Sequence, residues 1–525
     1  MSENNDVSQR FCTIEESFEG LSQCLQFIQT HWRPNYTLVI FNPSTCQSTY
    51  IIPTEQDWDA EILKIVDGLC HAEHTFPQYI EIDDIHHYYI IHMPLLRGRL
   101  QASTTYKSIN GKLTAITPPK QQYNAYYDES SHSRKITTNT VNAKEFTPYF
   151  CAAVLCVLKS QDAKFQDAYS KFEQKYRQEF TILPQNELKS CTPFGGHTFH
   201  RGLNLDKSKH DFISEYLDLL IQYDIPLFIF YSHKIEYCVR QYCDPLLQDP
   251  QWFSNSYDTL QYKQNIYAMT KLLQKYHPAT VLSKWNTDEF ISETKVFLQT
   301  QYCNNQSLSH KDVENQNIAQ ILQWLEREVT IKTEWNYKPI FECFSKYAHD
   351  ECMQIKKFDI DKEGNGKTKC AAQSCGFASA CEIDSKKSIM IRATDIAAGL
   401  FGALLDELEY KTQYPDDNSY LTPQYLPVEW LPRRASSFEL YKKLYAVLFL
   451  QHNSWHKVCA GYYNDAFAAL AALLKEVYAY DTWEDYQKAY QNQKDAKDNQ
   501  NKHLQKWEML TQIELRHHWE IHGLA

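Results

Sequence analysis

The chain has 525 residues, of which 43% are hydrophobic, and a formal net charge of -12. This length exceeds that of one compact domain, so we expect two to four domains. The negative charge argues against a simple basic protein that wraps duplex nucleic acid, although an enzyme needs a positive potential only in its cleft. The 16 cysteines, a polar N-terminus and the lack of a long apolar run predict a cytoplasmic protein with free thiols and no membrane segment.

Residues 1–118 predict a small α/β accessory domain. Strands are expected over residues 37–41, 48–52, 79–82 and 88–91, and helices around residues 18–28 and 62–69. We find no catalytic constellation in this range, so a sensor or docking role is expected. The pair Pro118-Pro119 marks the boundary to the next domain.

The central domain is expected in two parts, residues 119–234 and 356–410. Its first part contains predicted strands at 121–128, 150–158 and 226–231, which alternate with two amphipathic helices. Its closing part contains a polar stretch at 356–384, expected as a loop or an irregular strand pair, and a strong helix at 389–408. Residues 235–355 predict a helical insertion, and residues 411–525 predict a C-terminal helical region.

Three separated stretches of the central domain each supply a carboxylate. Asp128 ends a predicted strand, Glu187 lies in a loop, and Asp395 lies on the predicted helix. Phosphodiester hydrolysis needs charge stabilisation on the attacking and leaving oxygens, which divalent ions held by carboxylates supply. We therefore expect Asp128, Glu187 and Asp395 to ligate Mg²⁺ or Mn²⁺.

Neighbouring residues have expected supporting roles in catalysis and substrate binding. Glu129 points to the opposite face of the strand from Asp128, so it is expected as an auxiliary ligand. Lys189 is expected to orient a water or contact phosphate. The candidate substrate-binding residues are Arg392, Ser130, Lys207 and His197.

The helix that carries Asp395 has an unusual face. Arg392, Asp395, Gly399 and Gly402 share this face at helical spacing. Each glycine costs about 1 kcal/mol against alanine in an exposed helix interior, so we expect close approach of another element. A carboxylate on such a seam needs a partner, which is either a metal ion or Arg392.

Together the three stretches resemble the family filed as domain of unknown function 3800. The resemblance rests on Asp128-Glu129-Ser130, on Glu187-Leu188-Lys189 and on the helix segment from Arg392 to Gly399, and it covers roughly residues 121–234 and 380–408. It implies an RNase H-like mixed sheet with flanking helices and a metal-dependent nuclease acting on DNA or RNA. It also implies a link to bacterial antiviral defence or mobile elements. Arg392 departs from the family pattern, which has Gln at that position.

Several alternatives remain open at this point. A PD-(D/E)xK-type nuclease would use Asp128, Glu187 and Lys189 and leave Asp395 structural. A zinc site at Cys370, Cys375 and Cys381 with His349 and Cys352, or at His517, His518 and His522, has weak spacing support.

The sequence contains no P-loop lysine motif and no Gly-x-Ser-x-Gly elbow. We therefore expect neither a nucleotide cofactor nor a nucleophilic serine enzyme. A catalytically inactive binding or sensor subunit is the alternative from a different class. In either case a protein partner or activator is expected at the N- or C-terminal regions.

Overall fold

The computed structural model describes about two thirds of the chain. The described residues are 36–42, 47–51, 89–92, 105–109, 112–116, 120–130, 136, 138–141, 146–183, 185–244, 256–285, 287–326, 335–362, 366–411, 426–452 and 457–491. They fall into two compact units. The first unit comprises Met1–Gln122, Ser345–Gln354 and Leu448–Lys457, and the second comprises Tyr123–Phe344, Ile355–Val447 and Val458–Ala525.

The first unit contains two small antiparallel sheets. Strand β1 (Tyr36–Asn42) pairs with β2 (Gln47–Ile51) and with β3 (Tyr89–His92), and β4 (Thr105–Ile109) pairs with β5 (Lys112–Ile116). The predicted strands at 37–41, 48–52 and 88–91 are thereby confirmed. The predicted strand at 79–82 and the predicted helices near 18–28 and 62–69 lie outside the described residues.

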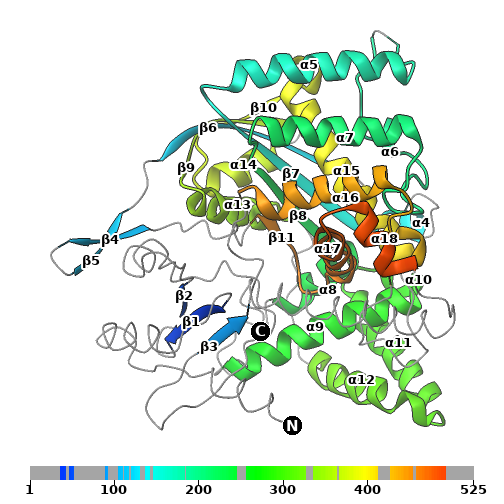
Figure 1. Ribbon diagram of the computed structural model, residues 1–525. Coiled ribbons are helices and arrows are strands. Elements are labelled where there is room, and N and C mark those ends of the chain that lie inside the picture. The colour runs from blue at the N-terminus through cyan, green and yellow to red at the C-terminus, as the bar shows by residue number, and fades with distance from the viewer. Residues whose placement is uncertain are drawn as a thin grey trace. The chain divides into compact units, whose positions relative to one another are not determined.

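The second unit is built around a six-stranded mixed sheet with the order β10-β9-β6-β7-β8-β11 (Figure 1). Strands β6 (Gln121–Ser130), β7 (Tyr149–Leu158) and β8 (Leu227–His233) form an antiparallel meander. Strand β9 (Met353–Asp361) starts at the same end as β6, where the Gln121 N–H donates to the Cys352 carbonyl at 3.2 Å, so these two strands run in parallel. Strand β10 (Ala380–Ile383) is parallel to β9. The α/β class predicted from the sequence is confirmed.

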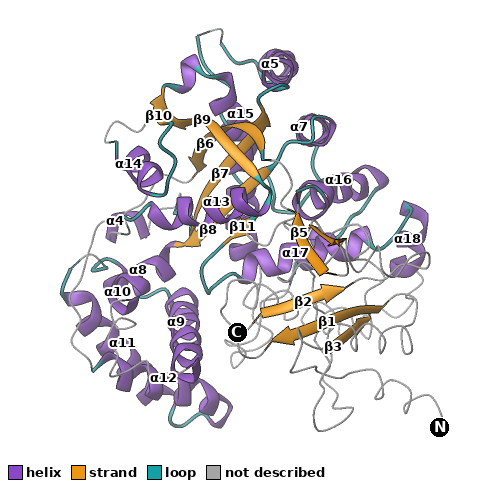
Figure 2. Cartoon of the chain, turned by 90° about the vertical axis from the view of Figure 1, so that its left-hand side faces the viewer, coloured by secondary structure: helices purple, strands orange, loops and turns teal. Residues whose placement is uncertain are grey.

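Helices cover both faces of this sheet. On one face, α15 (Ile389–Lys411) packs on β7, and it also contacts α5 (Asp162–Glu179) and the short α6 (Cys191–Phe194). Helix α7 (Lys207–Gln222) lies beside α5 (Figures 1 and 2). On the other face, α13 (Lys338–Asp350) packs through Phe341 against Tyr127 of β6 and through Phe344 against Phe228 of β8.

The insertion has a core of its own. Its helices are α8 (Lys234–Cys243), α9 (Ser256–Tyr276), α10 (Ala279–Leu282), α11 (Glu289–Asn305) and α12 (Asp312–Leu325), with the 3-10 turn η3 (Ser309–Lys311) before α12. Their buried side chains form one cluster that includes Met269, Phe290 and Ile318, and the short helix α4 (Thr138–Val141) joins it through Val141. Helix α13, although inside the predicted range 235–355, belongs with the sheet.

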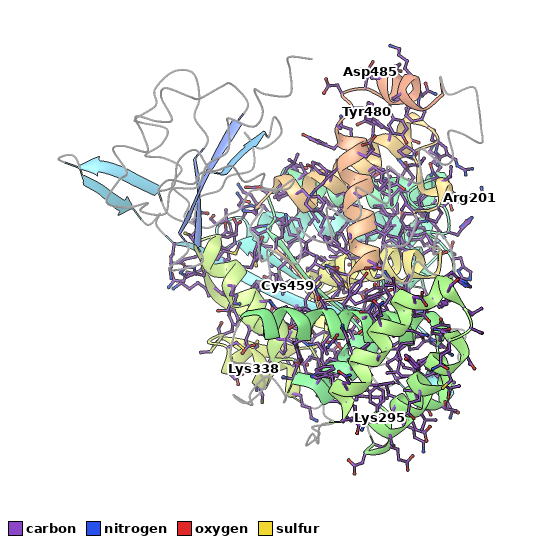
Figure 3. All side chains as sticks on the ribbon, turned by 90° about the horizontal axis from the view of Figure 1, so that it is seen from below. Arg201, Lys295, Lys338, Cys459, Tyr480 and Asp485 are labelled. Atoms are coloured by element: carbon purple, nitrogen blue, oxygen red, sulfur yellow. The ribbon has the colours of Figure 1, made fainter. Side chains whose placement is uncertain are left out.

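The C-terminal region also contributes to the sheet. It comprises the turn η5 (Val428–Trp430), α16 (Ala435–Tyr445), the π-helical turn η6 (Ala446–Leu450), β11 (Val458–Cys459), α17 (Asp465–Tyr478) and α18 (Trp483–Gln491). Strand β11 pairs in parallel with β8. Figure 3 places Cys459 among closely spaced side chains, in accord with its burial.

The stretch at 356–384, expected as a loop or an irregular strand pair, has the strand pair β9 and β10 with a helix between them. This stretch holds most of β9, then α14 (Lys367–Ser374) and β10, and the 3-10 turn η4 (Ser385–Lys387) follows it. Charged residues Lys357, Asp359 and Asp361 share one face of β9, and they hide the apolar alternation that marks a strand.

Among the described helices, none is both long enough and apolar enough to cross a bilayer.

Candidate functional site

Strand register fixes the direction of the first acid. Asp128 pairs with Ala153 of β7, and Ser130 pairs with Cys151. Because side chains alternate along a strand, Asp128 and Ser130 share a face. That face is the α15 side, since Gly402 of α15 approaches both Ser130 and Cys151. Asp128 is 3% exposed and accepts the Glu129 N–H on its Oδ1 at 2.8 Å.

Glu129 lies on the opposite face of the sheet. Its Oε2 accepts the hydroxyl of Tyr127 at 2.8 Å, and the Tyr127 ring packs on Phe341 of α13. The alternation expected from the sequence therefore holds. The structure does not bring the Glu129 carboxylate together with those of Asp128 and Asp395.

Asp395 is held by the loop that precedes α6. The Ser190 N–H donates to Asp395 Oδ2 at 2.7 Å, and the Ser190 hydroxyl donates to Oδ1 at 2.9 Å. Hydrogen bonds to a carboxylate stabilise its charged form. The loop and the helix are thereby joined at Asp395, which is 8% exposed.

The two glycines of α15 allow this junction. A Cβ on Gly399 would lie 2.2 Å from Ser190 Cβ, and a Cβ on Gly402 would lie 3.3 Å from Ser130 Oγ. The first distance is far below van der Waals contact, so only glycine fits at 399 without a shift. The close approach expected from the sequence is confirmed, and its partners are the loop at Ser190 and the end of β6.

Glu187 belongs to a second small network in the same loop. Its Oε2 lies 3.1 Å from Lys189 Nζ and accepts the Ser385 hydroxyl at 3.2 Å. Lys189 Nζ also donates to Ser385 Oγ at 3.3 Å. The Glu-x-Lys spacing thus brings the two charges of Glu187 and Lys189 together against η4, at the start of α15.

The Lys189 ammonium connects all three predicted acids. Burial lowers its pKa, but the negative charges of Asp395, Glu187 and Asp128 outweigh burial and raise the pKa above its usual value. An opposite charge has this effect most strongly within about 4–6 Å. Asp128, Glu187 and Asp395 therefore all act electrostatically on one lysine, which is 40% exposed at its side chain.

A fourth acid, Asp361, joins this group and was missed in the sequence. It ends β9, the parallel neighbour of β6, and its carboxylate accepts backbone N–H groups of Lys362 and Ser385. Burial raises the pKa of Asp361, Lys189 opposes the rise, and Glu187 adds to it. Neighbouring parallel strands end at the same edge of a sheet, so recognising β9 as a strand beside β6 would have identified Asp361.

We define the acidic centre as Asp128, Glu187, Asp361 and Asp395 with Lys189. Mg²⁺ and Mn²⁺ favour oxygen ligands, and the four acids offer only oxygen. Glu187 Oε1 is buried and has no hydrogen-bond partner among the described residues, which suits a cation ligand. Yet no three acidic, histidine or cysteine side chains in the described part of the chain lie close enough to hold an ion. The oxygen donors of the acidic centre suit a hard cation. In the structure, the positive charge next to these oxygens is the ammonium of Lys189.

Arg392 has a different partner from either one expected. Its guanidinium forms two bonds with Glu173 of α5, at 2.6 and 2.9 Å, and Nη1 donates to the Ser385 carbonyl at 2.8 Å. Both side chains of the pair are largely buried. The geometry makes Arg392 a clamp between α15, α5 and η4 rather than an outward phosphate contact.

Two other predicted substrate-binding residues lie apart from the acidic centre. His197 is 85% exposed at its side chain and pairs at 3.3 Å with Glu407, which lies twelve residues and about 18 Å along α15 from Asp395. Lys207 is exposed at the first turn of α7. Ser130 follows Asp128 and lies against Gly402.

The proposed cysteine ligands do not share a partner. Cys375 Sγ lies 3.8 Å from the Lys338 carbonyl, and Cys381 Sγ lies 3.5 Å from Asp359. All the described cysteines are free thiols. His517, His518 and His522 lie outside the described residues.

Comparison with known proteins gives no relative. No protein-family model, curated protein or solved structure matches this chain.

Proposed function

We propose that this chain is a metal-dependent nuclease whose central domain is RNase H-like and resembles the family filed as domain of unknown function 3800. The observation that carries the proposal is the grouping of Asp128, Glu187 and Asp395 around Lys189. The three acids come from a strand end, a loop and a helix that are far apart in sequence. Burying several carboxylates costs free energy and adds nothing to a hydrophobic core, so such a set is typical of a functional site.

The strand order supports the same proposal. An antiparallel meander of β6, β7 and β8, followed by the parallel strands β9 and β10 on the other side of β6, is compatible with the RNase H-like mixed sheet that we propose. Asp128 and Asp361 then end neighbouring parallel strands at one edge. Ligand sites of mixed α/β sheets favour such edges.

Each residue of the acidic centre has a role in the proposed reaction. Asp128, Glu187 and Asp395 would hold Mg²⁺ or Mn²⁺, and Asp361 would add a fourth oxygen donor. Such an ion, when bound, polarises the phosphoryl group and lowers the pKa of water. Ser190 fixes the orientation of Asp395, and Lys189 would neutralise the phosphate once an ion takes its place beside Glu187.

The test is a cleavage assay on labelled single- and double-stranded DNA and RNA with Mg²⁺, Mn²⁺ or EDTA. Wild type is compared with Asp128→Asn and Asp395→Asn, and with Asp167→Asn, an exposed acid paired with Lys171, as the control. We expect metal-dependent cutting that falls about a hundredfold or more in the first two variants and is unchanged in the control. Full activity in Asp395→Asn would instead favour the PD-(D/E)xK-type centre.

A second candidate is an inactive nuclease-like binding subunit. The Lys189 ammonium beside Glu187 favours it, because a lysine that permanently neutralises the acids replaces a metal ion. Nucleic-acid or protein binding with no cutting under any of the metal conditions would support this candidate.

A further inference from the structure

The segment from Lys356 to Lys387 is basic within an acidic chain. It holds seven lysines, at 356, 357, 362, 367, 369, 386 and 387, against five acids, at 359, 361, 363, 382 and 384, for a net charge of +2 in a chain of -12. Two of these acids, Asp359 and Asp361, have their own local partners. The segment therefore has the opposite sign of charge from the chain as a whole.

Three of these lysines lie next to the acidic centre. Lys362 follows Asp361 directly, and Lys386 and Lys387 belong to η4, whose Ser385 contacts Glu187. The two lysine-bearing segments meet at Asp361, because the carboxylate accepts backbone N–H groups from both Lys362 and Ser385.

Local geometry turns these lysines to the surface. Ser385 is buried, whereas the next two residues, Lys386 and Lys387, are exposed. Lys362 is exposed as well. The Asp384 side chain accepts the Lys386 N–H at 3.0 Å and so caps the turn that displays the two lysines. Lys171 and Lys488, two other exposed lysines of the second unit, are instead paired with acids on their own helices.

We propose that Lys362, Lys386 and Lys387, named here the lysine rim, bind the phosphate backbone of the nucleic acid and deliver it to the acidic centre. The proposal rests on the proposed function, since it names how the same site recognises its substrate. An acidic centre in a chain of this net charge repels a polyanion. A rim of ammonium groups next to it supplies the attraction and carries no base specificity.

The experiment measures binding without cleavage. Fluorescence anisotropy with labelled single- and double-stranded DNA and RNA is recorded in EDTA over a range of salt concentrations. The variant Lys362→Gln/Lys386→Gln/Lys387→Gln is compared with Lys284→Gln/Lys338→Gln/Lys488→Gln. The control lysines are exposed, are paired with nearby acids, and change the net charge by the same amount; Figure 3 places Lys338 at the periphery of the body.

The slope of log K against log salt is negative, and each phosphate contact contributes about 0.7 to 0.9 to its magnitude. We therefore expect the rim variant, which loses three contacts, to reduce the magnitude of the slope by about 2 to 3. The control variant should keep the wild-type slope. Equal weakening in both variants would show an effect of net charge alone and overturn the rim, as would wild type that binds none of the four nucleic acids. Binding through the rim with no cutting in Mg²⁺ or Mn²⁺ would leave the rim standing and remove the nuclease proposal.

Discussion

Lys189 is the residue on which the acidic centre depends. Its ammonium contacts Glu187, and the charges of Asp395 and Asp128 also act on it, so it offsets the repulsion among three like charges. Without it, repulsion among the carboxylates opposes folding unless another cation replaces it. The lysine and a divalent ion are therefore competitors for the same oxygens.

We expect Lys189→Met to have a lower melting midpoint than wild type in the absence of metal. Each 1 kcal/mol of lost unfolding free energy lowers the midpoint by about 2–4 °C. Added Mn²⁺ should raise the midpoint of this variant more than that of wild type, because binding to the folded state stabilises it. Differential scanning fluorimetry with and without Mn²⁺ measures both effects, with the exposed Lys207→Met as control. An equal Mn²⁺ response in all three proteins would contradict the competition.

Arg392 is a second residue whose role the structure redefines. Removing one partner of a buried ion pair leaves an uncompensated charge, which costs about 3 kcal/mol. We expect Arg392→Met to destabilise the protein by about that amount, and Arg392→Met/Glu173→Leu to recover most of the loss. Urea unfolding of the single and double variants measures this cycle.

The same double variant separates the clamp from a substrate contact. A structural clamp predicts that nucleic-acid binding recovers together with stability in Arg392→Met/Glu173→Leu. Recovered stability with binding still lost would return Arg392 to the substrate-contacting role expected from the sequence.

At the scale of elements, helix α15 and the loop at Ser190 act as one unit. The 2.2 Å that would separate a Cβ on Gly399 from Ser190 Cβ leaves no room for alanine, whereas the contacts at Gly402 begin at 3.3 Å. We expect Gly399→Ala to destabilise the protein by about 1–3 kcal/mol, as overpacking does. Because Ser190 orients Asp395, the proposed cleavage activity should also fall.

Gly402→Ala is the matched control on the same helix. Its neighbours need to shift by only a few tenths of an ångström, and alanine favours the helix by about 1 kcal/mol. Thermal melts of the two variants should therefore differ clearly, with Gly399→Ala the less stable. Equal melting midpoints would mean that the loop yields freely and does not position Asp395.

The elements that the sequence predicted well are those with strong local patterns. The apolar run of β7 and the long apolar face of α15 needed no tertiary information. The end of β9 was missed, and Asp361 with it, because the charged residues Lys357, Asp359 and Asp361 share one of its faces. The partner of Arg392 was missed for another reason: Glu173 lies 219 residues away, and no local rule joins two helices at that separation.

At the scale of the whole molecule, the sheet collects strands from distant parts of the chain. Strands β6, β7 and β8 precede the helical insertion in sequence, and β9 and β10 follow it. The two-residue β11 comes from the C-terminal region. So short a strand has no recognisable periodicity, so the sequence predicted this region as helical only. The order of strands likewise follows from long-range pairing rather than from local propensity.

The second unit also buries ionisable groups that do not belong to the acidic centre. Glu409 accepts the hydroxyls of Tyr149 and Tyr463 at 2.8 and 2.7 Å, and burial raises its pKa to about 7 despite these bonds. His233 lies edge-on to Tyr149, and burial together with Lys234 lowers its pKa to about 3. Nearby, Lys271 and Asp465 form a fully buried ion pair at 2.7 Å.

Glu409 and His233 affect stability in opposite directions. Unfolded Glu409 releases its proton near pH 4.5 and the folded form near 7, so its contribution to stability falls as pH rises between these values. Unfolded His233 takes up a proton below pH 6.5 while the folded form stays neutral to about 3, so its contribution falls as pH drops. Between pH 4.5 and 6.5 the two contributions offset each other.

Single variants should therefore reveal slopes that the wild type hides. We expect the stability of Glu409→Gln to rise with pH between 4.5 and 6.5 by about 1.4 kcal/mol per pH unit, and that of His233→Phe to fall by a similar amount. The double variant should be as flat as wild type with respect to this pair. Urea unfolding followed by tyrosine and tryptophan fluorescence across this range gives the four profiles. Parallel profiles in all four proteins would mean that these groups keep ordinary pKa values and that the interior of the body admits water.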